Sequence, residues 1–215
     1  VINKFPLKDN QLTTYTYILM FTGIIIDIGK IVELNNDKLV VKFDNPQFSN
    51  LELGTSIAID GCCLTLSDYE NNNLVFQVSE ETFSRTALNK DHCGYVNLEL
   101  PSTLNSFLSG HIVQGHVDST IKITNIAELE NGMWTFKFKD AISKYLVDKG
   151  SITINGISLT VVSPSADNFE VAVINETYNR TNFKYLKNES SVNVEYDVII
   201  KSVSYTHLTL PTMEL

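Results

Sequence analysis

The chain has 215 residues, of which 43% are hydrophobic, and it carries a formal net charge of -9 at pH 7. This acidic balance excludes a nucleic-acid-binding surface, which needs an excess of lysine and arginine. The apolar runs are too short to span a bilayer, and three cysteines do not make the disulfide framework of a secreted domain. We therefore expect a cytoplasmic protein that has no membrane-spanning segment and binds no nucleic acid.

The first half of the chain predicts six short strands rich in β-branched and aromatic residues, separated by Asn, Asp and Gly clusters. They cover residues 24–28, 39–43, 56–59, 64–66, 74–78 and 96–100. Residues 45–54 give a weak helix signal. The segment 101–107 predicts a linker, because Pro101 ends the preceding strand.

The second half repeats this series of strands. They cover residues 117–123, 135–138, 151–154, 159–162, 169–173 and 192–196. Residues 140–150 predict a short helix, with Asp140 as its N-cap and Gly150 at its end. The four histidines stand apart from any Cys-x-x-Cys pair and the glycines form no nucleotide-binding pattern, so we expect no metal and no cofactor.

The two halves are copies of one unit. SIAIDGCCLT (56–65) recurs as SITINGISLT (151–160), and the alignment continues without a gap to ETFSRT (81–86) over ETYNRT (176–181), with 12 identities in 31 positions. A unit of roughly 90 residues is too long for a solenoid repeat and has the size of a small domain. The sequence therefore predicts an all-β protein of two tandem six-stranded Greek-key barrels with short helices.

We place the first barrel at residues 20–107 and the second at 108–201. Residues 1–19 have no counterpart in the repeat and are predicted to be an extension. Residues 203–212 resemble the translation of a sequencing adapter, so 202–215 are predicted to be an artefactual tail in which His207 has no function.

Chemistry is expected at the repeated turn, where Gly61 permits a positive φ and a close ligand approach. Cys63, Thr65, Ser158 and Thr160 alternate with leucines, so each pair shares one face of its strand. That face can line a pocket, or these can be ordinary core residues.

Three of the differences between the copies bear on chemistry. At these positions the first half has Cys63, Ile24 and Pro101, and the second has a serine, a histidine and an aspartate. These second-half residues, Ser158, His116 and Asp197, are of the types that proton transfer and nucleophilic assistance require. One half is therefore expected to hold a ligand and the other to perform acid–base chemistry.

Six motifs in register with the duplication resemble the riboflavin synthase family, alpha-chain type, over residues 20 to about 201. They are MFTGII (20–25), DGCCLT (60–65), ETFSRT (81–86), GHIVQGHVD (110–118), NGISLT (155–160) and VEYDVI (194–199). The resemblance implies a transferase that converts two molecules of 6,7-dimethyl-8-ribityllumazine to riboflavin and 5-amino-6-ribitylaminouracil, without metal or cofactor. It also implies a homotrimer joined by a C-terminal helix, and an association with lumazine synthase.

In the family the active site lies between the N-barrel of one subunit and the C-barrel of its neighbour. Carried over by motif, the N-barrel site comprises Gly23, Ile24, Ile25, Cys62, Cys63, Leu64, Thr65 and the strand Phe76, Gln77, Val78, Ser79, Glu80, Glu81. The C-barrel site comprises Gly115, His116, Val117, Lys149, Ile157, Ser158, Leu159, Thr160 and the strand Val171, Ala172, Val173, Ile174, Asn175, Glu176.

His116 is the predicted base or proton relay, because histidine titrates near neutral pH. Ser158 with Asp197, and Cys63 across the subunit interface, are predicted to activate or stabilise the acceptor adduct. Each has a structural alternative. His116 can bond a strand end, Lys149 can be a solvated helix-end charge, Asp197 can be a turn residue, and Glu81 and Glu176 can cap the turns that follow them.

The end of the chain departs from the family, because Pro211 would break a helix interior. We therefore expect the C-terminal helix to be lost or altered and the trimer to be compromised. A second hypothesis is a lumazine- or flavin-binding protein of the same fold without catalysis. A reductase flavin domain would require a nicotinamide-binding partner domain, for which the sequence has no motif.

Overall fold

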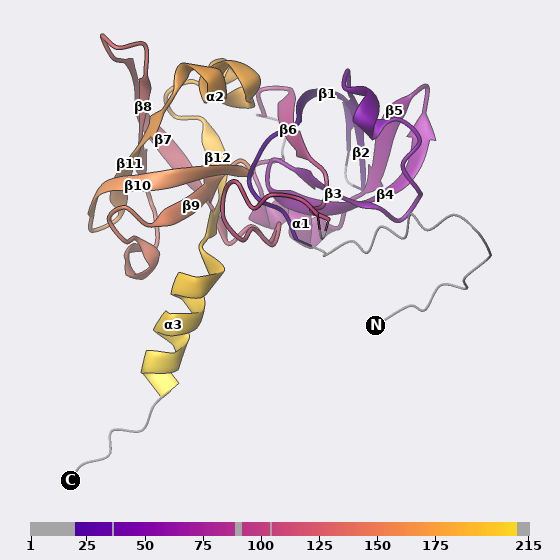
Figure 1. Ribbon diagram of the computed structural model, residues 1–215. Helices are drawn as coiled ribbons and strands as arrows, with labels where there is room; N and C mark the ends of the chain where they lie inside the picture. Colours follow the sequence, from indigo (N-terminus) through magenta and orange to yellow (C-terminus); the bar gives the residue numbers. More distant parts are fainter. Residues whose placement is uncertain (1–19, 36, 89–91, 104, 210–215) are drawn as a thin grey trace.

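The computed structural model describes residues 20–35, 37–88, 92–103 and 105–209, and it contains two β-barrels placed side by side (Figure 1). The first barrel consists of β1 (Asp27–Leu34), β2 (Lys38–Lys42), β3 (Ser56–Ile59), β4 (Cys62–Glu70), β5 (Asn73–Gln77) and β6 (Tyr95–Glu99). The second consists of β7 (Ser119–Glu128), β8 (Trp134–Lys139), β9 (Ser151–Ile154), β10 (Ile157–Ser165), β11 (Asn168–Val173) and β12 (Ser191–Tyr196).

Both barrels are closed and follow the same antiparallel path. The strand order is β1-β2-β5-β4-β3-β6 in the first, and β7-β8-β11-β10-β9-β12 in the second. In each barrel the fifth strand returns to pair with the second, and the sixth closes the ring against the first. The prediction of two six-stranded Greek-key barrels is therefore confirmed.

The duplicated sequence produces the same burial pattern in both copies. β4 and β10 bury alternate residues over their first half, which places Cys62, Leu64 and Leu66 in one core and Ile157 and Leu159 in the other. A buried side chain of this size stabilises the fold by about 1.5–3 kcal/mol. Because the period is two, the residues between them, including Cys63 and Ser158, are kept out of the core.

Two short helices lie where the sequence predicted the ends of strands. α1 (Glu80–Arg85) follows β5, and α2 (Asn175–Arg180) follows β11. The predicted site strands 76–81 and 171–176 are therefore wrong in their last residues. Ser79 caps α1 by accepting a hydrogen bond from Thr82 N, which explains why the strand ends there.

The helix predicted at 140–150 is wrong. Only η2 (Ser143–Tyr145) forms, because Asp140 and Lys149 have φ values of 68° and 65°, which a right-handed helix cannot accommodate. The weaker signal at 45–54 corresponds to η1 (Pro46–Phe48), and a third such turn, η3 (Asn182–Tyr185), follows α2.

The chain continues after β12 as α3 (Val198–Thr209), which projects away from both barrels (Figure 1). Asp197 Oδ1 accepts a hydrogen bond from Ile199 N at 2.8 Å, and Lys201 Nζ lies 2.9 Å from Asp118 Oδ2 at the base of the helix. The expectation that this helix is lost is wrong for 198–209, since local capping and an ion pair support it. Pro211 and the predicted extension 1–19 lie outside the described residues. Within the part that is described, no helix is long and apolar enough to cross a membrane.

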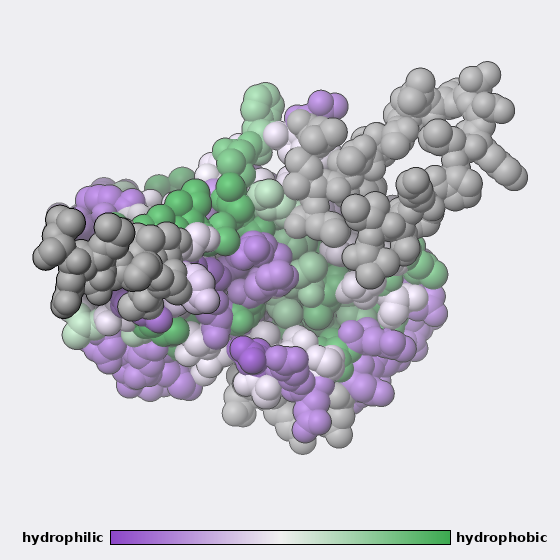
Figure 2. All heavy atoms as spheres, turned by 90° about the horizontal axis from the view of Figure 1, so that it is seen from below, coloured by the Kyte–Doolittle hydropathy of each residue, from purple (hydrophilic) through white to green (hydrophobic). Residues whose placement is uncertain are grey.

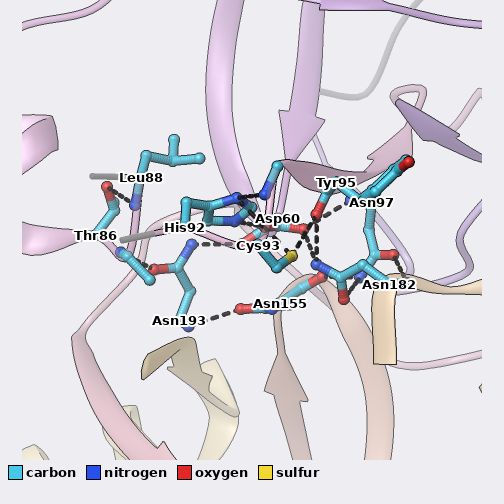
Figure 3. Close-up of polar contacts among 12 residues, drawn as sticks. Asp60, Thr86, Leu88, His92, Cys93, Tyr95, Asn97, Asn155, Asn182 and Asn193 are labelled. Atoms are coloured by element: carbon cyan, nitrogen blue, oxygen red, sulfur yellow. Dashed lines mark hydrogen bonds and ion pairs between the residues drawn. The ribbon is translucent and has the colours of Figure 1, made fainter. Parts of the chain in front are cut away.

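The barrels meet at a junction in which corresponding residues of the two halves make equivalent hydrogen bonds, so the junction has pseudo-twofold symmetry. Asn97 Nδ2 donates to Asn155 O at 2.8 Å, and the corresponding Asn193 Nδ2 donates to Asp60 O at 2.9 Å (Figure 3). A Cβ on Gly61 would lie 2.7 Å from the backbone nitrogen of Gly156. The repeated glycine therefore allows the two turns to approach each other closely.

Candidate functional site

The second barrel carries a cavity of about 140 Å³ beside Ser158, which we call the Ser158 cavity. From the second half it is lined by Ile157, Ser158, Glu176, Thr177, Arg180 and Thr181. The rest of its lining is the segment Gly23, Ile24 and Ile25 of the first half.

The first barrel carries the corresponding cavity, of about 380 Å³, which we call the Cys63 cavity. From the first half it is lined by Cys62, Cys63, Glu81, Thr82, Arg85 and Thr86. The rest of its lining is the segment Gly115, His116 and Val117 of the second half.

Each cavity is therefore closed by a segment from the opposite half. Ser158 N donates to Gly23 O at 2.8 Å, and Cys63 N donates to Gly115 O at 2.8 Å. We expected residues 23–25 to belong to the first barrel's site and 115–117 to the second barrel's site. Within one chain, these two backbone hydrogen bonds instead place each segment against the cavity of the other half.

Glycine is required where each segment contacts the opposite half of the chain. Gly23 and Gly115 each have a φ of 77°, and a Cβ on Gly23 would lie 2.6 Å from Ser158 Cβ. On Gly115 it would lie 2.7 Å from Cys63 Cβ. A larger residue at either position would displace the segment from the cavity wall.

Two buried carboxylates hold these segments in place. Glu99 of β6 accepts hydrogen bonds from Thr22 N at 2.7 Å and Gly23 N at 3.1 Å, and Glu195 of β12 accepts them from the backbone nitrogens of 114–116. Burial raises the pKa of Glu99 to about 7, although its hydrogen bonds oppose this shift. Burial also raises the pKa of Glu195, against opposing hydrogen bonds and the charge of Lys201. The repeated VN-x-E motif carries these residues, but sequence reasoning gave them no role.

The histidine that meets Ser158 is His111. Its Nδ1 lies 2.7 Å from Ser158 Oγ, and its Nε2 lies 3.1 Å from Thr153 Oγ1 on the neighbouring strand. Burial lowers the pKa of His111, an effect that the charge of Asp197 opposes. The imidazole is therefore neutral at neutral pH and can act as a base. Sequence reasoning missed it, although it stands in the same GHIVQGHVD motif as His116.

His116 and Asp197 lie elsewhere. His116 is exposed and lines the Cys63 cavity, and its backbone N–H donates to Glu195 Oε2 at 2.9 Å. Asp197 caps α3 and lines neither cavity. Within one chain, His116 therefore lines the cavity opposite to that of Ser158, and Asp197 acts on the His111–Ser158 couple through its charge.

Comparisons with known proteins agree with this architecture. A model of the lumazine binding domain matches residues 22–101 and 114–197. The riboflavin synthase of Actinobacillus pleuropneumoniae is 37% identical over 200 residues, which cover 91% of this chain and 93% of that protein. The chain belongs to the riboflavin synthase family. The riboflavin synthase of Bacillus subtilis (strain 168) is 38% identical over 188 residues, covering 85% of this chain and 87% of that protein.

The fold is also that of the crystal structure of LumP complexed with 6,7-dimethyl-8-(1'-D-ribityl) lumazine. The TM-score is 0.73 at 26% identity, covering 82% of this chain and 98% of LumP. The predicted riboflavin synthase family, its enzyme class and its duplicated lumazine-binding barrels are confirmed.

Other residues that the riboflavin synthase resemblance suggested line neither cavity. They are Leu64, Thr65, Phe76, Gln77, Val78, Ser79, Glu80, Lys149, Leu159, Thr160, Val171, Ala172, Val173, Ile174 and Asn175. Phe76 and Val171 are fully buried in the barrel cores. Lys149 donates its backbone N–H to Val161 O at 3.0 Å and serves the turn before β9.

Threonines and arginines that were not predicted as site residues line the two cavities instead. Thr82, Arg85 and Thr86 line the Cys63 cavity, and Thr177, Arg180 and Thr181 line the Ser158 cavity. The repeated Glu-Thr-x-x-Arg-Thr motif was the available signal. Each glutamate pairs with the arginine four residues later, at 3.0 Å in α1 and 3.3 Å in α2.

The cysteines of the first cavity are poor nucleophiles as they stand. Burial raises the pKa of the Cys63 thiol, which a hydrogen bond with Ser56 partly opposes. Burial raises the pKa of Cys62 to about 12. Both thiols are therefore protonated at neutral pH, whereas the thiolate is the reactive form.

Proposed function

We propose that this chain catalyses the dismutation of two molecules of 6,7-dimethyl-8-ribityllumazine to riboflavin and 5-amino-6-ribitylaminouracil. The observation that carries the proposal is the His111–Ser158 couple at the wall of the Ser158 cavity, in a member of the riboflavin synthase family. The reaction needs two lumazines held at once, and the duplicated cavities provide two places for them.

In the proposed reaction one lumazine loses a proton from its 7-methyl group to His116 on the lining of the Cys63 cavity, and the other lumazine is attacked at C7. His111 is neutral because burial lowers its pKa, so its Nδ1 accepts the Ser158 proton while the serine oxygen bonds to C7. The Thr153 hydroxyl at Nε2 orients the ring. General-base assistance of this kind is worth about 10²–10⁴-fold in rate.

The Cys63 cavity is proposed to hold the second lumazine. Cys63 is a protonated thiol there, and His116 is an exposed imidazole on the same lining. These groups suit binding and proton relay. Bringing two rings face to face can itself contribute about 7–11 kcal/mol through orientation.

A homotrimer is proposed because one chain does not complete the site. The Ser158 cavity, at about 140 Å³, is smaller than the roughly 300–1,000 Å³ of ligand pockets. No described residue lines both cavities, so a face-to-face pair of ligands requires a cavity from each of two copies.

The helix α3 supplies an apolar surface for assembly. Ile199 is 58% exposed and Val203 is 52% exposed. Figure 2 views the face from which α3 projects, and hydrophobic residues lie there on either side of a hydrophilic cluster. Exposed apolar patches of this kind mark interaction surfaces.

The first test is to mix the purified chain with the lumazine, follow absorbance for riboflavin, and determine the sedimentation mass. Riboflavin formed by a trimer is the expected result. A lumazine that binds unchanged to an intact trimer would contradict the enzyme and favour a binding protein, the hypothesis that the likeness to LumP supports.

Assembly is tested by Ile199→Asp with Val203→Asp. We expect a monomer with turnover reduced at least about 100-fold, because the two rings can no longer be juxtaposed. Val32→Asp is the matched control, since Val32 is 57% exposed on β1, away from α3. Equal loss in the control would contradict a specific role of α3. The association with lumazine synthase and the cytoplasmic location remain predictions.

A further inference from the structure

A third cavity, of about 480 Å³, lies between β1 and β2 of the first barrel and α2 and η3 of the second. It is lined by four cationic side chains, Lys30, Lys42, Arg180 and Lys184, by the carboxylates Asp27 and Asp44, and by Ile26, Ile28, Tyr95 and Tyr185. The whole chain carries a net charge of -9. A concave surface with more cations than carboxylates is therefore a local exception, and we call it the basic cavity.

Two of its lysines face each other without neutralisation. Lys30 and Lys42 are directly opposite in the β1–β2 ladder. Like charges in this arrangement destabilise a sheet. Among the residues that the structure describes, no carboxylate lies within salt-bridge distance of either lysine. The pair is therefore available to an anion.

Three of the other charged side chains of the lining already have hydrogen-bond partners within the protein. Asp27 Oδ2 accepts hydrogen bonds from Asp44 N at 3.0 Å and Asn45 N at 2.8 Å. Lys184 Nζ donates to Asn179 O at 2.8 Å, and Arg180 uses one terminal nitrogen on Glu176. Asp44 is exposed, as are Lys30 and Lys42, so solvent partly screens all three charges.

The second barrel contains the same opposed pair in a neutralised form. Lys122 faces Lys139 in the β7–β8 ladder, as Lys30 faces Lys42. There, Lys139 Nζ lies 3.8 Å from Glu189 Oε2, and Lys122 Nζ donates to Glu189 O at 3.2 Å. The turn before β6 offers Cys93 and Gly94 in place of that glutamate. Among the described residues, this opposed lysine pair therefore lacks a carboxylate partner only in the basic cavity.

We propose that the basic cavity binds the phosphate of a phosphomonoester. A phosphate is a dianion with three strong acceptor oxygens, and it matches a group of convergent lysine and arginine donors. Tyr95 and Tyr185, stacked at 4.0 Å between ring centroids, form a rigid wall. Arg180 also lines the Ser158 cavity. The phosphate can therefore be free, or it can terminate a ribityl chain whose ring occupies that cavity.

Isothermal titration calorimetry in phosphate-free buffer at low ionic strength tests the proposal, with inorganic phosphate, riboflavin 5'-phosphate and riboflavin as probes. We expect the wild type to bind inorganic phosphate. Lys30→Gln with Lys42→Gln should weaken this binding about tenfold, since it removes two exposed cations that would contact the phosphate. Neither lysine lines the Ser158 or Cys63 cavity, so turnover of the lumazine should persist.

Lys122→Gln with Lys139→Gln is the matched control, and it should leave phosphate binding unchanged. Thermal unfolding of both variants, and of the single variant Lys42→Gln, verifies that each is folded. A preference for riboflavin 5'-phosphate over riboflavin that vanishes in the Lys30/Lys42 variant would assign the phosphate to a ribityl ligand. Binding of inorganic phosphate without that preference would assign it to a free anion. Absence of phosphate binding in the wild type, or equal weakening by both variant pairs, would overturn the proposal whatever the turnover.

Discussion

The two barrels have one architecture but different junction chemistry. Asp60 and Asn155 occupy equivalent positions in the corresponding turns of the two barrels. Each accepts a hydrogen bond from the backbone of the last strand of its own barrel, at 2.7 Å from Asn97 N and 2.8 Å from Asn193 N. In the first barrel, Asp60 Oδ2 also lies 2.9 Å from His92 Nε2 (Figure 3). Asn155 has no such partner among the described residues.

This difference shows how a duplicated fold acquires asymmetry. Gly94 N donates to His92 Nδ1 at 3.1 Å, and His92 Nε2 faces Asp60. Burial lowers the pKa of His92, but the hydrogen bond and charge of Asp60 outweigh it and raise this pKa to about 10. The same division occurs at the cavities, where Ser158 has a histidine at 2.7 Å and Cys63 is a protonated thiol. Shared backbone geometry preserves the scaffold, and single substitutions separate the roles of the two halves.

The largest expected effect concerns the charged side of the junction. His92→Ala leaves the buried Asp60 carboxylate without its imidazole partner, and it should lower the free energy of unfolding by about 3–5 kcal/mol in urea titrations. Asp60→Asn in that background should restore most of the loss, because it recreates the neutral arrangement at Asn155. A double variant no more stable than His92→Ala would contradict this account.

The proposed difference in role between the two cavities is tested by comparing Ser158→Ala with Cys63→Ala. We expect kcat for the lumazine to fall about 100-fold in the serine variant and less than about tenfold in the cysteine variant, because only Ser158 has an adjacent base. Stopped-flow absorbance measures both. His111→Gln should behave like Ser158→Ala, with lumazine binding retained in each. Equal effects at 63 and 158 would refute the asymmetry.

The smallest expected effect is the pH dependence of stability that arises from Glu99, the carboxyl group that holds the segment 22–23. The pKa of Glu99 is raised to about 7 in the folded chain, so its contribution to stability is complete below about pH 4.5 and is lost as the pH rises through about 7. From pH 5 to pH 8 the free energy of unfolding should fall by about 2 kcal/mol from this group. Glu99→Gln should flatten the profile. A wild type stabilised by Glu99 on going to pH 8 would show that the hydrogen bonds from Thr22 and Gly23 prevail over burial.

Much of the architecture could be predicted because its signals are local. β3 and β9 occupy the residues predicted for them, 56–59 and 151–154, since alternating side chains and the turns after them specify strands. The helices α1 and α2 were missed because six-residue helices give no periodic pattern. The helix at 140–150 was predicted from caps and apolar spacing, whereas positive φ at Asp140 and Lys149 prevents it.

The amino-acid sequence by itself determined the duplication, the six strands of each barrel, the family, and the residue types from which the cavities are built. Only the tertiary structure decided that residues 23–25 cover the Ser158 cavity and 115–117 the Cys63 cavity. It also decided that His111, rather than His116, meets Ser158. Strand periodicity is a property of neighbouring residues, whereas these contacts join opposite halves of the chain through the pseudo-twofold junction. They arise only when both barrels are closed and packed together.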